Sequence, residues 1–128
     1  MDDPRGPARI LLVDDEPDQV EMYHFALEHA GFAVDDAVTG AAAIAQAHDR
    51  RPNLIVLDVR LPDMSGWDVC DALKKDPATA RIPIIILTAA ASATIGQEAA
   101  KHGCVAHLLK PCYPDDLTQM VRQILATA

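Results

Sequence analysis

The stretch NLIVLDVRLPDMSGWDVCDALKK (residues 53–75) contains a complete structural unit. Its first part, Asn53–Leu57, is a short run of mostly branched apolar residues, which is typical of a strand buried on both faces of a sheet. The proline and glycine of the next segment are typical of a loop, and a helix is expected at Trp67–Lys75. Asp58 follows the strand directly. The segment therefore predicts a strand, a loop and a helix, in that order.

The same alternation of short apolar runs and helical patterns extends in both directions along the chain. Strands are expected at Arg9–Val13, Phe32–Ala37, Asn53–Leu57, Ile84–Leu87 and Val105–Leu109. Helices are expected at Pro17–Ala30, Ala41–His48, Trp67–Lys75, Ser92–His102 and Pro114–Ile124. Strict alternation predicts an α/β fold with a doubly wound, open, five-stranded parallel sheet covered by helices on both faces. A closed barrel would need about twice the length.

Gly96 interrupts the fourth expected helix. Glycine inside a helix costs about 1 kcal/mol relative to alanine. This helix is therefore predicted to be the least stable of the five.

Length and charge limit the classes of function. The chain has 128 residues, half of them apolar, which fits an arm at residues 1–8 and one domain at residues 9–126. With 19 acidic and 11 basic residues, its formal net charge is -8. An acidic chain repels phosphate backbones, so we expect no direct contact with nucleic acid or anionic membranes. The longest mostly apolar run, Ile82–Ala93, falls short of the roughly 20 residues of a membrane helix.

The three cysteines, Cys70, Cys104 and Cys112, form no C-x-x-C pair. Free thiols in a reducing cytoplasm are the simplest explanation. A zinc site made of His102, Cys104, His107 and Cys112 is an alternative that we disfavour, because this spacing matches no usual zinc pattern.

Polar residues follow four of the five expected strands. Asp14 and Asp15 follow the first strand, Asp58 the third, Thr88 the fourth and Lys110 the fifth. The carboxyl ends of parallel strands meet at one edge of a sheet, which is where open α/β sheets bind ligands. Any one of these acids alone would more often be a helix cap or a strand-end residue. Together the five predict one shared site.

The chemistry of this set points to a divalent cation and a phosphoryl group. Carboxylates that lie close together stay ionised only when cations neutralise them, and hard oxygen ligands suit Mg²⁺ or Mn²⁺. Phosphoryl transfer requires little beyond positioning and charge neutralisation, to which Lys110 and Thr88 can contribute. One of the carboxylates could then act as the nucleophile and form an aspartyl phosphate.

At these residues the chain resembles the receiver domain of bacterial two-component response regulators. The resemblance covers Arg9 to Ile124 and depends on four motifs: ILLVDDE (10–16), LIVLDVRLPDMSG (54–66), IPIIILTA (82–89) and LLKP (108–111). It implies a flavodoxin-like (βα)5 three-layer sandwich with strand order 2-1-3-4-5.

The resemblance also assigns roles around the acidic residues. Asp58 would accept a phosphoryl group from a histidine kinase or a histidine phosphotransfer protein. Asp15, Asp58 and the backbone carbonyl of Arg60 would bind Mg²⁺, and Asp14 would act largely through water.

Further roles follow for residues near the last two strands. The side chain of Lys110 and the backbone N–H of Ala89 would contact the phosphoryl oxygens, and the Lys110–Pro111 peptide bond would be cis. Thr88 would move towards the phosphate and bias the face formed by the fourth helix, fifth strand and fifth helix.

The sequence departs from the family pattern at two places in this face. His107 stands where the family usually has a tyrosine or phenylalanine that switches together with the threonine. It is interpreted as a half-buried histidine on an edge strand, and a pH-dependent switch is the second interpretation. Cys112 replaces a usual aromatic residue.

The expected partners follow from the same resemblance. The phosphodonor protein is expected to dock on the first helix near Gln19 and Tyr23. The downstream partner would be an effector protein or domain, and homodimerisation on activation is a further expectation.

No turnover of outside substrates is expected beyond the domain's own phosphorylation and dephosphorylation. The alternatives are a receiver-like interaction module that is never phosphorylated and a metal-dependent phosphohydrolase. No output segment is recognised after Ile124, and the chain could be the receiver part of a longer regulator or hybrid kinase.

Overall fold

The computed structural model describes residues 6–89 and 93–127, in which five strands and five helices alternate. The strands are β1 (Arg9–Val13), β2 (Ala33–Ala37), β3 (Leu54–Leu57), β4 (Ile84–Thr88) and β5 (Ala106–Leu109). The helices are α1 (Pro17–His29), α2 (Gly40–Arg50), α3 (Gly66–Lys75), α4 (Ile95–Lys101) and α5 (Pro114–Thr127). The strands form one parallel sheet in the order β2-β1-β3-β4-β5, which confirms the predicted fold class and topology.

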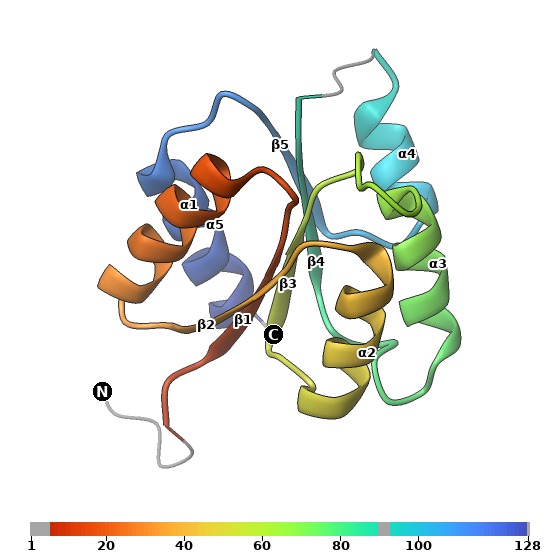
Figure 1. The fold of residues 1–128 in the computed structure, drawn as a ribbon, viewed down its shortest axis with the longest axis horizontal. Helices are drawn as coiled ribbons and strands as arrows, with labels where there is room; N and C mark the ends of the chain where they lie inside the picture. The colour runs from red at the N-terminus through yellow and green to blue at the C-terminus, as the bar shows by residue number, and fades with distance from the viewer. Residues whose placement is uncertain (1–5, 90–92, 128) are drawn as a thin grey trace.

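Two layers of helices cover the sheet (Figure 1). Helices α1 and α5 lie on one face, and α2, α3 and α4 lie on the other. Successive residues of each central strand point to opposite faces of the sheet. In β1, Ile10 and Leu12 pack under α1 and α5, whereas Leu11 and Val13 pack under α2 and α3. Both faces are apolar because both are covered, which explains the continuous apolar runs of the sequence.

The largest difference from the expected boundaries concerns α4. The sequence predicts a helix over Ser92–His102, but the helix runs from Ile95 to Lys101, and Ser92 lies outside the described residues. The first turn of this helix is closed by the carbonyl of the preceding residue, Thr94, which accepts the N–H of Glu98 at 2.9 Å. Apart from a few residues at their ends, the other elements agree with the prediction. Five of the eight residues expected to form the arm also lie outside the described part.

Tyr23 on α1 is fully buried, so the side chain itself offers no docking surface, and docking on this part of α1 stays a prediction. Its hydroxyl donates to the Cys112 carbonyl at 2.9 Å and so ties α1 to the segment before α5. Tyr23 belongs to the stripe of α1 that faces the sheet, together with Leu27. Met22 and Phe25 instead expose 37% and 69% of their surface.

None of the described helices is long and apolar enough to cross a membrane.

His24 links α1 to the edge strand β2. Its Nδ1 lies 2.7 Å from a carboxylate oxygen of Asp36, and its Nε2 lies 3.3 Å from one of Glu28. Burial lowers the pKa of His24, but the hydrogen bond and charge of Asp36, with those of Glu28, raise it by more, so the net pKa lies above the ordinary value of 6.5.

Replacing His24 with glutamine is expected to destabilise the protein more at about pH 5.5 than at about pH 8.5. A raised folded-state pKa contributes stability that is complete below pH 6.5 and is lost as the pH rises through the folded value. Because the ion pairs are partly exposed, we expect a difference below about 1 kcal/mol. Urea unfolding at the two pH values measures it, with Asp36→Asn as the matched variant. A larger loss at the higher pH would contradict the prediction.

Candidate functional site

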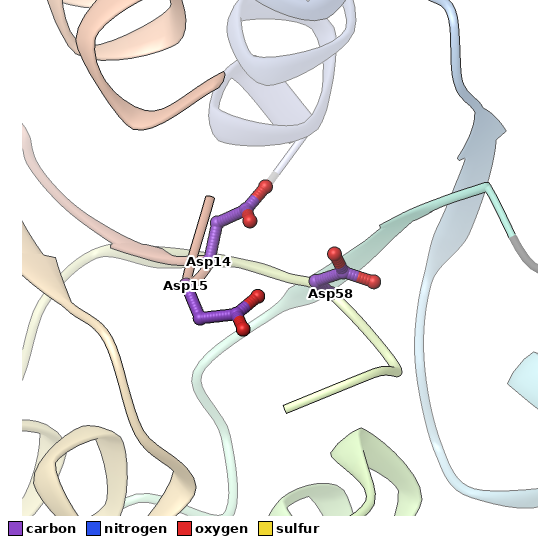
Figure 2. A group of neighbouring side chains, drawn as sticks. All are labelled: Asp14, Asp15 and Asp58. Carbon is purple, nitrogen blue, oxygen red and sulfur yellow. The ribbon is translucent and has the colours of Figure 1, made fainter. Parts of the chain in front are cut away.

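Three carboxylates gather at the carboxyl ends of two paired strands. Asp14 and Asp15 follow β1, Asp58 follows β3, and Figure 2 shows the three side chains side by side. One ligand oxygen from each lies within 4.8 Å of the other two. Asp14 is 2% exposed and Asp58 8%, whereas Asp15 faces solvent. The site is therefore an acidic cleft with one open side.

Lys110 reaches this cluster from the end of β5, although two strands separate β5 from β1 in the sheet. Its ammonium group lies 2.5 Å from Asp14 Oδ2 and 3.1 Å from Asp58 Oδ2. Burial lowers the pKa of Lys110, but the hydrogen bond to Asp14 and the charge of Asp58 raise it by more. The lysine therefore stays protonated and neutralises part of the negative charge.

The remaining oxygens of the two buried carboxylates accept backbone hydrogen bonds. Asp14 Oδ1 accepts the N–H of Glu16 at 3.0 Å, and Asp58 Oδ1 accepts the N–H of Arg60 at 3.2 Å. Both oxygens of Asp14 are therefore engaged by this chain. Asp15 has the most exposed carboxylate of the three.

The loop after Asp58 closes on itself and fixes the carboxylate. Arg60 pairs with Ser65 in an isolated bridge, and the Gly66 N–H donates to the Val59 carbonyl at 2.7 Å. A Cβ atom at Gly66 would lie 2.5 Å from the Asp58 carbonyl oxygen. Only glycine fits there, which is the physical reason for a glycine at this place in the sequence.

Asp63 joins the same loop to α2, a role that the sequence analysis missed. Its carboxylate accepts the backbone N–H groups of Gly40 at 2.8 Å and Ala41 at 3.0 Å. These hydrogen bonds lower the pKa of Asp63. The cap comes from a residue that lies over twenty positions away, so a local capping pattern could not identify it.

The other predicted residues lie at or just beyond the carboxyl ends of β3, β4 and β5. Thr88 ends β4 and is fully buried, and the Lys110–Pro111 peptide bond is cis. Ala89 and Arg60 line the acidic cleft. The cleft has a volume of about 340 Å³ and is lined by Asp15, Glu16, Asp58, Arg60, Leu61, Pro62, Ala89 and Lys110.

His107 does not line the cleft. It is half-buried on β5 opposite Ile86, and a Cβ atom at Gly96 of α4 would lie 3.3 Å from its ring. The glycine that weakens α4 thus leaves room for the histidine ring.

The zinc site considered from the sequence is contradicted by the positions of its ligands. His102 bonds to Asp71 at 2.7 Å, and Cys104 lies against Cys70. Within residues 6–89 and 93–127, the three aspartates form the one group of acidic, histidine or cysteine side chains close enough to share a metal ion.

The donor set fits a hard divalent cation. Three carboxylates and one ammonium carry a local charge of about -2, and every candidate ligand atom is an oxygen. Mg²⁺ and Mn²⁺ prefer such ligands, and an open side leaves room for water or a phosphoryl oxygen.

Residues 10–122 match the model of the response regulator receiver domain. The chain belongs to this family. The DNA-binding dual master transcriptional regulator RpaA of Synechocystis sp. is 36% identical over 117 residues, which are 91% of this chain and 48% of that protein. The Vibrio cholerae chemotaxis response regulator CheY4 matches with a TM-score of 0.86 at 30% identity, over 92% of this chain and 98% of CheY4.

A further solved structure bears on the metal. The receiver domain of the sensor histidine kinase PA1611 from Pseudomonas aeruginosa is described with a magnesium ion coordinated in the active site cleft. It matches with a TM-score of 0.87 at 26% identity, over 94% of this chain and 99% of that domain. Phosphorylation and magnesium binding are standard in the receiver family. The chain spans half or less of the length of the curated relatives it matches, as with 49% of MtrA and 25% of LuxO.

Asp15→Asn is expected to weaken Mg²⁺ binding by at least about tenfold, which corresponds to about 1.4 kcal/mol. The change removes a negative charge from the most exposed oxygen ligand and leaves the ion pair of Lys110 intact. Calorimetric titration with Mg²⁺ measures the affinity. Asp68→Asn removes an exposed acid of α3 outside the cluster and serves as the control. Equal losses in both variants would show that the cation responds only to net charge.

Proposed function

We propose that Asp58 accepts a phosphoryl group from the phosphohistidine of a histidine kinase or a histidine phosphotransfer protein, in a Mg²⁺-dependent reaction. One observation carries the proposal: the Asp58 carboxylate lies within 4.8 Å of ligand oxygens of Asp14 and Asp15 and 3.1 Å from the Lys110 ammonium. An oxygen of Asp58 attacks phosphorus, the nitrogen–phosphorus bond breaks, and the donor imidazole leaves.

The ligands proposed for the cation are Asp15, Asp58 and the backbone carbonyl of Arg60. Asp14 acts through water, since both of its oxygens already accept hydrogen bonds from Glu16 and Lys110. The cation, Mg²⁺ or Mn²⁺, supplies positive charge next to the transferred phosphoryl group.

Lys110 exchanges partners during the reaction. Its bond to Asp58 is the longer of its two ion pairs, so its ammonium can move to a phosphoryl oxygen and remain anchored to Asp14. The backbone N–H of Ala89, at the cleft, donates to a second oxygen, and the Thr88 hydroxyl moves towards a third.

The conformational change on phosphorylation extends to α4, β5 and α5. Thr88 and Leu109 are partners in the β4–β5 register, and His107 lies two residues earlier on β5, against α4 at Gly96. Movement of Thr88 towards the phosphate therefore changes the packing of His107 under α4. A short seven-residue helix with an internal glycine suits an element that switches between two arrangements.

The phosphodonor protein docks between α1 and α5. A groove of about 940 Å³ runs there, with the exposed Met22 and Phe25 on one wall and Thr118 on the other. An exposed apolar surface of this kind is typical of a protein interface. The downstream partner is an effector protein or domain, and activation brings two copies together through the α4-β5-α5 face.

The proposed activity is limited to the domain's own phosphorylation and dephosphorylation. Among the described residues, Glu16 is the one acid besides Asp15 and Asp58 that lines the cleft of about 340 Å³. We propose the cytoplasm as its location, in keeping with three free thiols. Residues 9–126 form the domain and, at a net charge of -8 for the chain, do not themselves contact nucleic acid. RpaA is named as a DNA-binding regulator, and this chain covers 48% of its length.

Incubation with phosphoramidate and Mg²⁺ is expected to add a single phosphoryl group to the chain and none to Asp58→Asn. Intact-mass spectrometry measures the addition. Asp68→Asn, which leaves the acidic cleft unchanged, should behave like the parent chain. No addition to the parent would favour the alternative of an interaction module that is never phosphorylated.

If His107 acts as a pH-dependent switch, activation should differ between about pH 6 and about pH 8. Beryllofluoride with Mg²⁺ is expected to shift the amide signals of α4 and β5 differently at the two pH values. His107→Tyr should remove the difference. Identical shifts at both values would leave His107 as an ordinary half-buried side chain.

A further inference from the structure

Two cysteines that lie far apart in the sequence meet beside the third helix. Cys70 of α3 and Cys104, in the segment between α4 and β5, have sulfur atoms 3.3 Å apart. Cys70 is fully buried, whereas Cys104 is partly exposed. A disulfide requires the sulfur atoms to approach to about 2.0 Å, so a movement of about 1.3 Å between them is sufficient.

Neighbouring contacts hold the two segments against each other. Trp67 stacks on His102 with ring centroids 4.9 Å apart, and His102 Nδ1 lies 2.7 Å from a carboxylate oxygen of Asp71. A Cβ atom at Gly103 would lie 3.2 Å from Lys74 Cε, so the lysine side chain packs closely against this glycine. The sulfur atoms therefore meet within an ordered interface.

The two thiols differ in exposure and in the direction in which their surroundings shift the pKa. The hydrogen bond between the two sulfur atoms, aided by the charge of Lys74, lowers the pKa of Cys104 by more than burial raises it. The hydrogen bond to Cys104 and burial raise the pKa of Cys70. Burial also raises the pKa of Cys112. The thiolate is the form of cysteine that attacks an oxidant, so we expect Cys104 to react first. Cys70 is then close enough to attack the oxidised sulfur of Cys104.

We propose that Cys70 and Cys104 form a reversible disulfide when the protein meets a peroxide. The Cys104 thiolate attacks an oxygen of hydrogen peroxide, the oxygen–oxygen bond breaks, and a sulfenic acid and water form after protonation. The Cys70 sulfur then attacks the Cys104 sulfur, the sulfur–oxygen bond breaks, and a second water leaves. Both sulfurs are oxidised, one peroxide is reduced to two waters, and a dithiol reverses the change.

The disulfide would tie α3 to the start of β5. Cys104 lies three residues before His107, in the segment that connects α4 to β5. A covalent link at Cys104 restrains the α4-β5-α5 face, so oxidation reduces the amplitude of activation. This consequence rests on the proposed function, whereas the disulfide itself does not.

Intact-mass spectrometry after treatment with hydrogen peroxide tests the disulfide. The chain and Cys112→Ser are expected to lose two hydrogen atoms per molecule and to recover them with dithiothreitol. Cys104→Ser and Cys70→Ala should show no such loss, and peptide mapping of the oxidised chain should join Cys70 to Cys104. The lone tryptophan, Trp67, should change its fluorescence in the same samples. No loss, or a link that includes Cys112, would overturn the proposal.

The restraint is tested separately with beryllofluoride and Mg²⁺ on the oxidised and reduced forms of Cys112→Ser. Smaller amide shifts in α4 and β5 of the oxidised form are expected. Equal shifts in both forms would overturn the restraint and leave the disulfide standing. An absence of shifts in both forms would count against the proposed function rather than the disulfide.

Discussion

The ion pairs of Lys110 with Asp14 and Asp58 are the interactions on which the rest of the site depends. Three carboxylates at the ends of two neighbouring strands repel one another, and two of them are largely buried. The lysine neutralises only part of this charge, and the negative charge that remains favours binding of a divalent cation. This remaining charge lies at the place where the proposed cation and phosphoryl group would bind.

The fold makes this concentration of charge tolerable. β1, β3 and β4 are buried on both faces and anchor their polar end residues in a rigid sheet. The loop after Asp58 is fixed by the close approach of Gly66 and by the cap that Asp63 provides for α2. The elements near β5 are less constrained, because α4 is short and contains Gly96. The strands that hold the carboxylates are thus rigid, whereas α4 and β5, which form part of the proposed output face, can adapt.

Much of the fold and most of the candidate site could be predicted from the sequence, because buried parallel strands read as apolar runs and their end residues share one edge. The four motifs at the strand ends added the strand order through their resemblance to a family. Interactions between distant segments could not be predicted. The cap by Asp63, the contact of Cys70 with Cys104 and the room that Gly96 leaves for His107 all depend on packing that no local pattern records. The exposed Met22 and Phe25 beside the buried Tyr23 likewise became apparent only from the structure.

The most direct test of the central claim is a crystal structure with Mg²⁺ and beryllofluoride bound. We predict beryllium on an oxygen of Asp58, a fluoride beside the Lys110 ammonium, and the cation in contact with Asp15 and Asp58. A structure in which the Asp58 carboxylate points out of the cleft, or in which the cation binds away from Asp15, would contradict the account.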